Sequence, residues 1–288
     1  MWCRFGTFPE GPASEPEVTM PNRPSQPSAS LPGEDDPVYS RRRQTILEAA
    51  QAYTPGRPVP VVDYAPDDHR LWRTLTGELE QLHQKYACRE FLEGAGRLGL
   101  PRTHVPQLAD VSAGLRTLTG FTFDPAPAIL PPTEFIGPLA ERRFQATQYL
   151  RHSSRPHFSP EPDMLHELVG HGPALAHERW AALYELFGHT VRRLRDDEAV
   201  GTVARVFWFT METGVVRQGG ELKVCGATLM SSVGELRAME TADLRPLSVR
   251  EMAARDYDVD AYQPVLFCAE SFADLDAALV DFLTSFDG

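Results

Sequence analysis

The stretch PEPDMLHELVGHGP, residues 160–173, carries two histidines, His166 and His171, five positions apart between prolines and glycines. Zinc proteases carry such a pair four residues apart, on one face of a helix. Five residues turn an α-helix by about 500°, which points the two rings roughly 140° apart. We expect Gly170 and Gly172-Pro173 to end the helix, so that the second ring turns back on an irregular backbone. The pattern favours one metal ion bound by both rings; two unconnected histidines at a helix end are the alternative.

Glu212 is the best candidate for a third ligand. It is the acidic residue of the apolar run VFWFTMETG, residues 206–214. A carboxylate in such a run must be paired, protonated or bound to a metal. Two imidazoles suit iron, copper, zinc or nickel, and two imidazoles with one carboxylate are the arrangement of non-haem Fe(II) oxygenases. A salt bridge from Glu212 to Arg205 or Arg217 is the structural alternative.

The composition describes an ordinary folded protein with small-molecule ligands. A chain of 288 residues with 42% hydrophobic content can bury one good core. The net charge of −12 argues against nucleic acid and anionic membranes as partners. We expect no membrane span and no signal peptide. The cysteines are scattered and predict free thiols in a reducing cytoplasm: Cys3, Cys88, Cys225 and Cys268.

Hydrophobic periodicity predicts a mainly α-helical protein with a small β-hairpin and sheet. Residues 1–39 contain eight prolines and predict a disordered Pro/Ser-rich tail. A short helix capped by Ser40 and a connector occupy residues 40–58, and one folded domain occupies residues 59–288. We expect His69 and His83 on the surface of the first long helix. That helix covers residues 67–86, with Asp67 as its N-cap. Further helices are predicted for residues 106–120, 180–187, 196–212 and 271–282. We expect a loop at residues 121–138, a short strand at 144–151, a hairpin at 215–224 and a strand at 256–269.

Several segments together resemble the catalytic core of the pterin-dependent aromatic amino acid hydroxylases. They are residues 148–152, 160–173, 207–219, 223–235 and 269–272, and the resemblance runs from about residue 59 to the C-terminus. It implies the catalytic-domain fold of that family, with residues 59–288 as an iron- and pterin-dependent hydroxylase domain. It also implies one Fe(II) ion bound by His166, His171 and Glu212, a tetrahydropterin such as tetrahydrobiopterin, and O2 as co-substrate.

The resemblance further implies which residues bind the organic ligands. For the tetrahydropterin these are Phe135, stacked on the pterin ring, with Leu130, Glu167 and Phe207. Arg151 could bind a carboxylate with its planar guanidinium group, and the family uses this arginine for the amino acid, assisted by the residue at Ser159. Further contacts with the amino acid are implied for Trp208, Thr213, Thr228, Ser231 and Val259.

The same resemblance suggests L-phenylalanine as the substrate. Val259 lies where tyrosine hydroxylases have an aspartate, and Trp208 matches phenylalanine hydroxylases, although Gln145 matches tyrosine hydroxylases. Thr213 replaces a phenylalanine of the family, and Thr228 replaces a glycine or alanine. Losing volume on one wall and gaining it on another should shift the ring sideways and favour meta over para hydroxylation. A minority of bacterial relatives of that family make meta-tyrosine for natural-product biosynthesis, and we hypothesise that this protein is one of them.

Other possibilities remain open at this point. Para hydroxylation of phenylalanine is the nearest alternative. A zinc hydrolase could use the same three ligands, and an inactive amino-acid-binding module could keep them. The regulatory domain and assembly extension of the family have no counterpart here, so we expect a cytoplasmic monomer.

Overall fold

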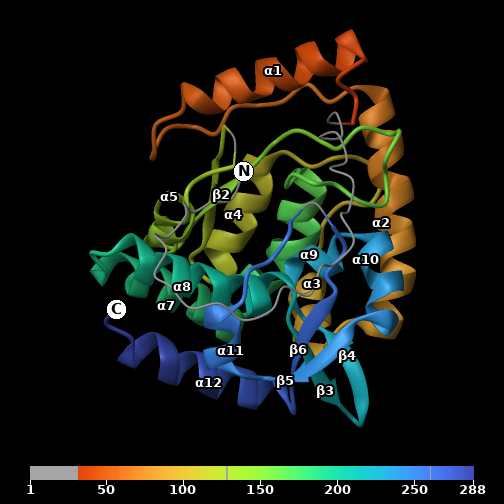
Figure 1. Cartoon of the computed structure of the whole chain (residues 1–288). Coiled ribbons are helices and arrows are strands. Elements are labelled where there is room, and N and C mark those ends of the chain that lie inside the picture. The colour runs from red at the N-terminus through yellow and green to blue at the C-terminus, as the bar shows by residue number, and fades with distance from the viewer. Residues whose placement is uncertain (1–31, 128, 260) are drawn as a thin grey trace, which may run out of the picture.

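The computed structural model describes residues 32–288 except 128 and 260, and these residues form a mainly helical body with two small sheets (Figure 1). The predicted fold class is therefore confirmed. Most of the predicted 1–39 tail lies outside the described residues. The helices are α1 (Pro37–Gln51), α2 (Pro66–Tyr86), α3 (Arg89–Leu98), α4 (Leu108–Leu118), α5 (Pro132–Ile136), η1 (Gly137–Glu141), η2 (His166–His171), α6 (Gly172–Ala176), α7 (Glu178–Arg193), α8 (Asp197–Phe207), η3 (Trp208–Glu212), α9 (Ala227–Met230), α10 (Val233–Ala238), η4 (Met239–Thr241), α11 (Val249–Ala254) and α12 (Phe272–Ser285).

The strands form two sheets at different places in the body. In the smaller sheet β1 (Thr122–Pro125) runs parallel to β2 (Arg143–Ala146). In the larger one the order is β4 (Glu221–Val224), β3 (Val215–Gln218), β6 (Val265–Ala269) and β5 (Asp243–Pro246). The predicted hairpin is confirmed: β3 and β4 are antiparallel, joined by Gly219 and Gly220 at φ +62° and +84°. Such positive angles suit glycine, which has no Cβ to clash.

Several local predictions were wrong. Asp36, and not Ser40, caps α1, because its carboxylate accepts from the amides of Val38 and Tyr39. Helix α2 begins at Pro66, one residue before the predicted cap Asp67. Residues 121–138 are not one loop, since they contain β1 and α5. Helix α3, which the sequence reading missed, carries the pair Gly94 and Gly96 and packs on α6 so closely that a Cβ on Gly94 would lie 1.9 Å from the Pro173 carbonyl oxygen.

His83 is also not where the sequence placed it. Its side chain is buried, with Nε2 2.7 Å from the carbonyl oxygen of Met230 at the end of α9. The ring lies edge-on to Phe91, at 5.0 Å between centroids. His69 is half-buried and accepts a hydrogen bond from the Val105 amide. An amphipathic pattern identifies the buried face of α2 but cannot show that α3 and α9 also cover its flank.

Aromatic side chains pack behind the cluster of histidines described below. Phe207 lies edge-on to Phe187 and Tyr184, at 5.1 and 5.8 Å between centroids, and Phe144 lies 6.0 Å from Tyr184. These side chains are buried, and burying each one stabilises the fold by about 1.5 to 3 kcal/mol. Their edge-to-face packing fixes α7, α8 and β2 against one another. No helix in the described part of the chain is both long and apolar enough to cross a membrane.

Candidate metal centre and substrate cavity

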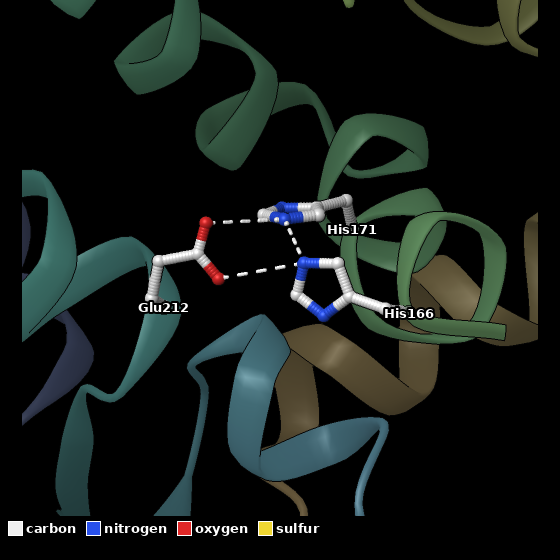
Figure 2. A group of neighbouring side chains, drawn as sticks. All are labelled: His166, His171 and Glu212. Carbon is white, nitrogen blue, oxygen red and sulfur yellow. Dashed lines mark hydrogen bonds and ion pairs between the residues drawn. The ribbon is translucent and has the colours of Figure 1, made fainter. Parts of the chain in front are cut away.

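The three side chains predicted to bind a metal converge on one point (Figure 2). His166 Nε2 and His171 Nε2 lie 3.0 Å apart. Glu212 presents one oxygen to each ring, with Oε1 3.2 Å from His171 Nε2 and Oε2 3.7 Å from His166 Nε2. One donor atom from each residue lies within 4.8 Å of the others, which is close enough for one ion to bind all three.

The backbone that carries the two histidines is a π-helical turn, and this corrects the sequence reading. The helix does not end at Gly170; it continues through Gly172 into α6. The Gly172 amide donates to the Glu167 carbonyl five residues earlier, so the turn is wider than in an α-helix. Residues five apart therefore lie on the same face, and no reversal of the chain is needed to aim both rings.

The segment that carries Glu212 uses the same device. η3 is a second π-helical turn at the end of α8, in which the Thr213 amide donates to the Trp208 carbonyl at 3.0 Å. The Thr213 hydroxyl donates to the same carbonyl at 2.9 Å. π-Helical turns are rare and occur often at functional sites. Here both segments that supply donor atoms to the cluster contain one.

Each imidazole is oriented by a hydroxyl on its other nitrogen. His171 Nδ1 lies 2.8 Å from the Tyr184 hydroxyl, and His166 Nδ1 lies 3.0 Å from Ser231 Oγ. These contacts leave Nε2 of both rings for a metal. Burial, and next the neighbouring His171, lower the pKa of His166 to about 4, so this ring is neutral at pH 7 and has a lone pair to donate.

Glu212 has no salt bridge to either arginine that the sequence offered. Arg205 donates to the Ala253 carbonyl and to Thr202, and Arg217 lies 4.0 Å from Glu270. Burial alone would raise the pKa of Glu212, but the His171 and His166 rings and the Thr228 hydroxyl lower it to about 2. The carboxylate is therefore ionised. Its Oε2 accepts a hydrogen bond from Thr228 Oγ1 at 2.8 Å.

A cavity opens beside this cluster and gathers most of the predicted site residues. Its volume, counted out to its open mouth, is about 860 Å³, within the range of sites for small organic ligands. Thr213 and Phe207 do not line it: Thr213 is buried against the Trp208 backbone, and Phe207 packs edge-on behind Phe135 at 5.7 Å. The predicted residues that line it are Leu130, Phe135, Arg151, Ser159, His166, Glu167, Trp208, Glu212, Thr228, Ser231 and Val259.

Arg151 is held by a partner that the sequence reading missed. Its Nε and Nη2 donate to the two oxygens of Asp163 at 2.8 and 2.7 Å, and both side chains are buried. Asp163 also accepts from the amides of Arg151 and His166. Burial alone would raise the pKa of Asp163, but the charge of Arg151 and these hydrogen bonds hold it below its usual value. Asp163, in the PEPD part of residues 160–163, therefore links Arg151 to the π-helical turn that carries His166 and His171.

Two further residues of the cavity are fixed by their neighbours. Glu167 is buried, and its Oε1 accepts from the amide and the hydroxyl of Thr147 at 3.0 and 3.1 Å. Burial raises the pKa of Glu167 well above its usual value. Trp208 stacks on Tyr257 at 4.5 Å between centroids, and its Nε1 donates to Gln263 Oε1 at 3.0 Å. Sequence reasoning named neither Tyr257 nor Gln263.

Ser231 and Ser159 contact the protein itself in ways that the resemblance did not indicate. Ser231 lines the cavity but bonds to the His166 ring, so it holds a donor group of the cluster in place. Ser159 Oγ donates to the Glu161 carbonyl at 2.6 Å, which fixes the turn that follows Arg151 along the cavity rim.

Comparisons with known proteins agree on the kind of protein that this chain resembles. The family described as "Biopterin-dependent aromatic amino acid hydroxylase" matches residues 18–287. Phenylalanine 3-hydroxylase of Streptomyces coeruleorubidus is 45% identical over 252 residues, which cover 88% of this chain and 90% of that protein. Human phenylalanine-4-hydroxylase is 38% identical over 252 residues, 85% of this chain but 56% of the human protein.

Solved structures resemble this one over most of its length. Phenylalanine hydroxylase of Chromobacterium violaceum, with bound iron(III) and oxidized 7,8-dihydrobiopterin, superposes with a TM-score of 0.76 at 27% identity, covering 85% of this chain and 90% of that one. The phenylalanine hydroxylase of Legionella pneumophila superposes with a TM-score of 0.72 at 30% identity, covering 79% and 89%.

Proposed function

Because the chain belongs to the biopterin-dependent aromatic amino acid hydroxylase family, we propose that it hydroxylates the aromatic ring of L-phenylalanine at the meta position. Like its family, it is a monooxygenase that uses Fe(II), a tetrahydropterin and O2. The observation that carries the proposal is the convergence of His166, His171 and Glu212 beside a cavity that also contains Arg151. The site thus offers donors for an iron ion and a cation for an amino acid carboxylate.

The three donor side chains suit Fe(II). Two imidazoles and one carboxylate are the ligands that this ion takes in non-haem oxygenases, with positions left open for other groups. When bound, the iron together with the reduced pterin supplies the oxygen chemistry. The protein keeps Nε2 of His166 and His171 free by hydrogen bonds to Ser231 and Tyr184.

The organic ligands are assigned to the residues that line the cavity. We place the pterin against Phe135 and Leu130 with Glu167 nearby, because an aromatic face packs well on a flat heterocycle. Phenylalanine is placed between Arg151 and Trp208. The role of Arg151 as the carboxylate-binding residue is supported by its contact with Asp163. Because Asp163 already orients the guanidinium group, that group loses little conformational freedom when it binds a carboxylate.

The meta assignment is supported by the 45% identical relative named phenylalanine 3-hydroxylase and by Thr228. Thr228 lines the cavity and adds a branched side chain next to Glu212. Thr213 acts differently from what the sequence suggested. Because it contacts the Trp208 carbonyl and does not line the cavity, we infer that it sets the position of the Trp208 wall. Both changes alter which carbon of the ring lies nearest to the metal.

The test is to supply L-phenylalanine, Fe(II), O2 and tetrahydrobiopterin and to separate the tyrosine isomers. We expect meta-tyrosine as the main product; para-tyrosine alone would refute the assignment. The double variant Thr213→Phe with Thr228→Ala should shift the product towards para. Thr228→Val keeps the branched shape without the hydroxyl, so it should keep the meta preference if shape is the cause.

Metal and pterin analysis separates this function from the other classes. A zinc hydrolase would purify with tight zinc and would not oxidise pterin, and an inactive binding module would bind phenylalanine without turnover. We expect instead that iron restores oxidation of the pterin and that this oxidation depends on phenylalanine.

We further propose a cytoplasmic monomer with residues 59–288 as its catalytic unit. The unpaired, buried Cys88, Cys225 and Cys268 support a reducing compartment, and light scattering tests the monomer.

A further inference from the structure

Glu235 is a buried carboxylate in the wall of the substrate cavity with no role in the contacts described so far. It lies on α10 and is 2% exposed. Its Oε2 accepts a weak hydrogen bond from the Gln263 amide at 3.3 Å. Its Oε1 has no hydrogen-bond partner among the described residues. An unpartnered buried oxygen costs about 1 to 3 kcal/mol, so a protein keeps one where a ligand can pair with it.

The ordinary structural role for this glutamate is not the one it performs. Ser232 caps α10, and a glutamate three residues after a capping serine usually bonds back to the amide of the cap. Here the Ser232 amide donates to the Leu229 carbonyl at 3.3 Å instead. The Glu235 amide does bond to Ser232 Oγ, so only half of the capping pair is formed. The Glu235 carboxylate is therefore left for the cavity.

The other carboxylates that line the cavity already have partners. Glu161 is paired with Arg43, Glu167 accepts from Thr147, and Glu212 belongs to the metal cluster. Among the described carboxylates that line the cavity, Glu235 thus has an oxygen that is both buried and without a hydrogen-bond partner. Burial raises its pKa to about 7, as expected for an acid without a cation beside it.

We propose that Glu235 binds the α-ammonium group of the amino acid substrate while Arg151 binds its carboxylate. The inference rests on the proposed function, because it requires a zwitterionic amino acid in this cavity. Gln263 links this contact to the aromatic wall, since its backbone amide donates to Glu235 and its side chain accepts from Trp208 Nε1. The three groups of the substrate, carboxylate, ammonium and ring, then each have a fixed partner.

Pairing the ammonium group in this way gives the site selectivity for amino acids over other aryl acids. A site built for a charged donor leaves its own acceptor unpaired when the donor is missing. The ligand that tests this is 3-phenylpropanoate, which has the ring and carboxylate of phenylalanine and lacks only the ammonium group.

The experiment measures binding of both ligands by calorimetry to Fe(II)-loaded protein with tetrahydrobiopterin in the absence of O2. Glu235→Gln should weaken binding of L-phenylalanine by about 10- to 100-fold. The affinity of the same variant for 3-phenylpropanoate should change less than about twofold. Glu240→Gln is the matched control, because it removes the same charge from an exposed position that contacts Lys85 and Tyr86. It should leave both affinities unchanged.

Several outcomes would overturn the proposal. Equal losses for the two ligands would show a structural role for Glu235, and a loss seen only when tetrahydrobiopterin itself is titrated would assign the carboxylate to the pterin. Failure of the unaltered protein to bind phenylalanine would overturn the proposed function as well. Should Glu235→Gln not fold by circular dichroism, Glu235→Asp keeps the charge but shortens the reach. It should still weaken phenylalanine selectively, and an unselective loss would again count against the assignment.

Discussion

Every donor residue of the metal cluster has one atom committed to the protein. Tyr184 holds His171, Ser231 holds His166, and Thr228 holds Oε2 of Glu212. Such outer contacts orient a ligand and tune its basicity. Thr228 is the residue whose observed role differs most from the role predicted from the sequence. The sequence suggested that it changes cavity shape, whereas its hydroxyl also fixes a metal-binding carboxylate.

The hydroxyl of Thr228 should therefore matter for metal binding apart from its shape. We expect Thr228→Val to weaken Fe(II) or Co(II) binding by about 10-fold or more, because Glu212 Oε2 loses its donor. Thr228→Ser keeps the hydroxyl and should bind metal nearly as well as the unaltered protein. Metal titration followed by absorbance of bound Co(II) checks both variants. Equal affinities for Val and Ser would show that the hydrogen bond contributes nothing.

At the scale of elements, the two π-helical turns place the donors, and a close approach of α9 holds the first turn. A Cβ added to Gly170 in η2 would lie 2.6 Å from the Ala227 carbonyl oxygen in α9. The glycine thus allows the turn that carries both histidines to contact the helix that carries Thr228. An alanine there must push the two elements apart.

Gly170→Ala should consequently destabilise the protein by about 1 to 3 kcal/mol and weaken metal binding. Gly96→Ala serves as the control: Gly96 is exposed on α3, and its added Cβ would meet nothing within 4 Å. That change should stabilise the helix by about 0.5 to 1 kcal/mol. Denaturant unfolding of the metal-free proteins measures both effects, and an unaffected Gly170→Ala variant would remove the close approach from the explanation.

The buried His83 on α2 predicts a dependence of stability on pH. Burial lowers its pKa to about 4 in the folded protein, against about 6.5 in the unfolded chain. The unfolded chain therefore binds the proton more readily, and stability is lost as the pH falls from 7 towards 4. For this one group the loss between pH 7 and pH 5 is about 2 kcal/mol.

Replacing the histidine should remove that dependence. His83→Gln can still donate to the Met230 carbonyl but does not titrate, so its free energy of unfolding should fall less between pH 7 and pH 5. His189→Gln alters an exposed histidine on α7 and should leave the pH dependence unchanged. Urea unfolding at the two pH values compares the three proteins. Parallel losses in all of them would contradict a buried, neutral His83.

At the scale of the whole molecule, α1 lies across one side of the body (Figure 1). The Tyr39 hydroxyl donates to the Leu150 carbonyl at 3.0 Å, next to Arg151 in sequence. Arg43 forms an ion pair with Glu161 and lies over the Tyr149 ring, 4.4 Å from its centroid. Helix α1 packs outside the two sheets and outside the two π-helical turns. Through these contacts it supports the segment that lines the substrate cavity.

Arg43→Gln should weaken the contact between α1 and the segment that lines the substrate cavity. We expect a loss of stability of about 1 kcal/mol, because the ion pair and the ring contact are only partly shielded from water. Affinity for phenylalanine should fall by a few-fold, since Glu161 belongs to the cavity rim. Arg41→Gln removes an exposed charge from the same helix and is the control. Thermal unfolding and calorimetry measure the two effects; identical behaviour of the two variants would exclude the link from α1 to the cavity.

The sequence by itself determined the helical fold class and the hairpin, and it identified His166, His171 and Glu212 as candidate donors of a metal cluster. These follow from local periodicity, from turn glycines, and from the rarity of a carboxylate inside an apolar run, all of which are properties of neighbouring residues. It also named most of the cavity wall, but only through resemblance to a family.

Tertiary structure alone decided the contacts between distant segments. The spacing of His166 and His171 excluded a regular helix but could not show a π-helical turn, because that turn is stabilised by the packing of α9 against Gly170. Likewise, the unused oxygen of Glu235 is visible only when every possible donor around it has been placed. Whether a buried polar group has a partner depends on chain segments far apart in sequence, so no local pattern encodes it.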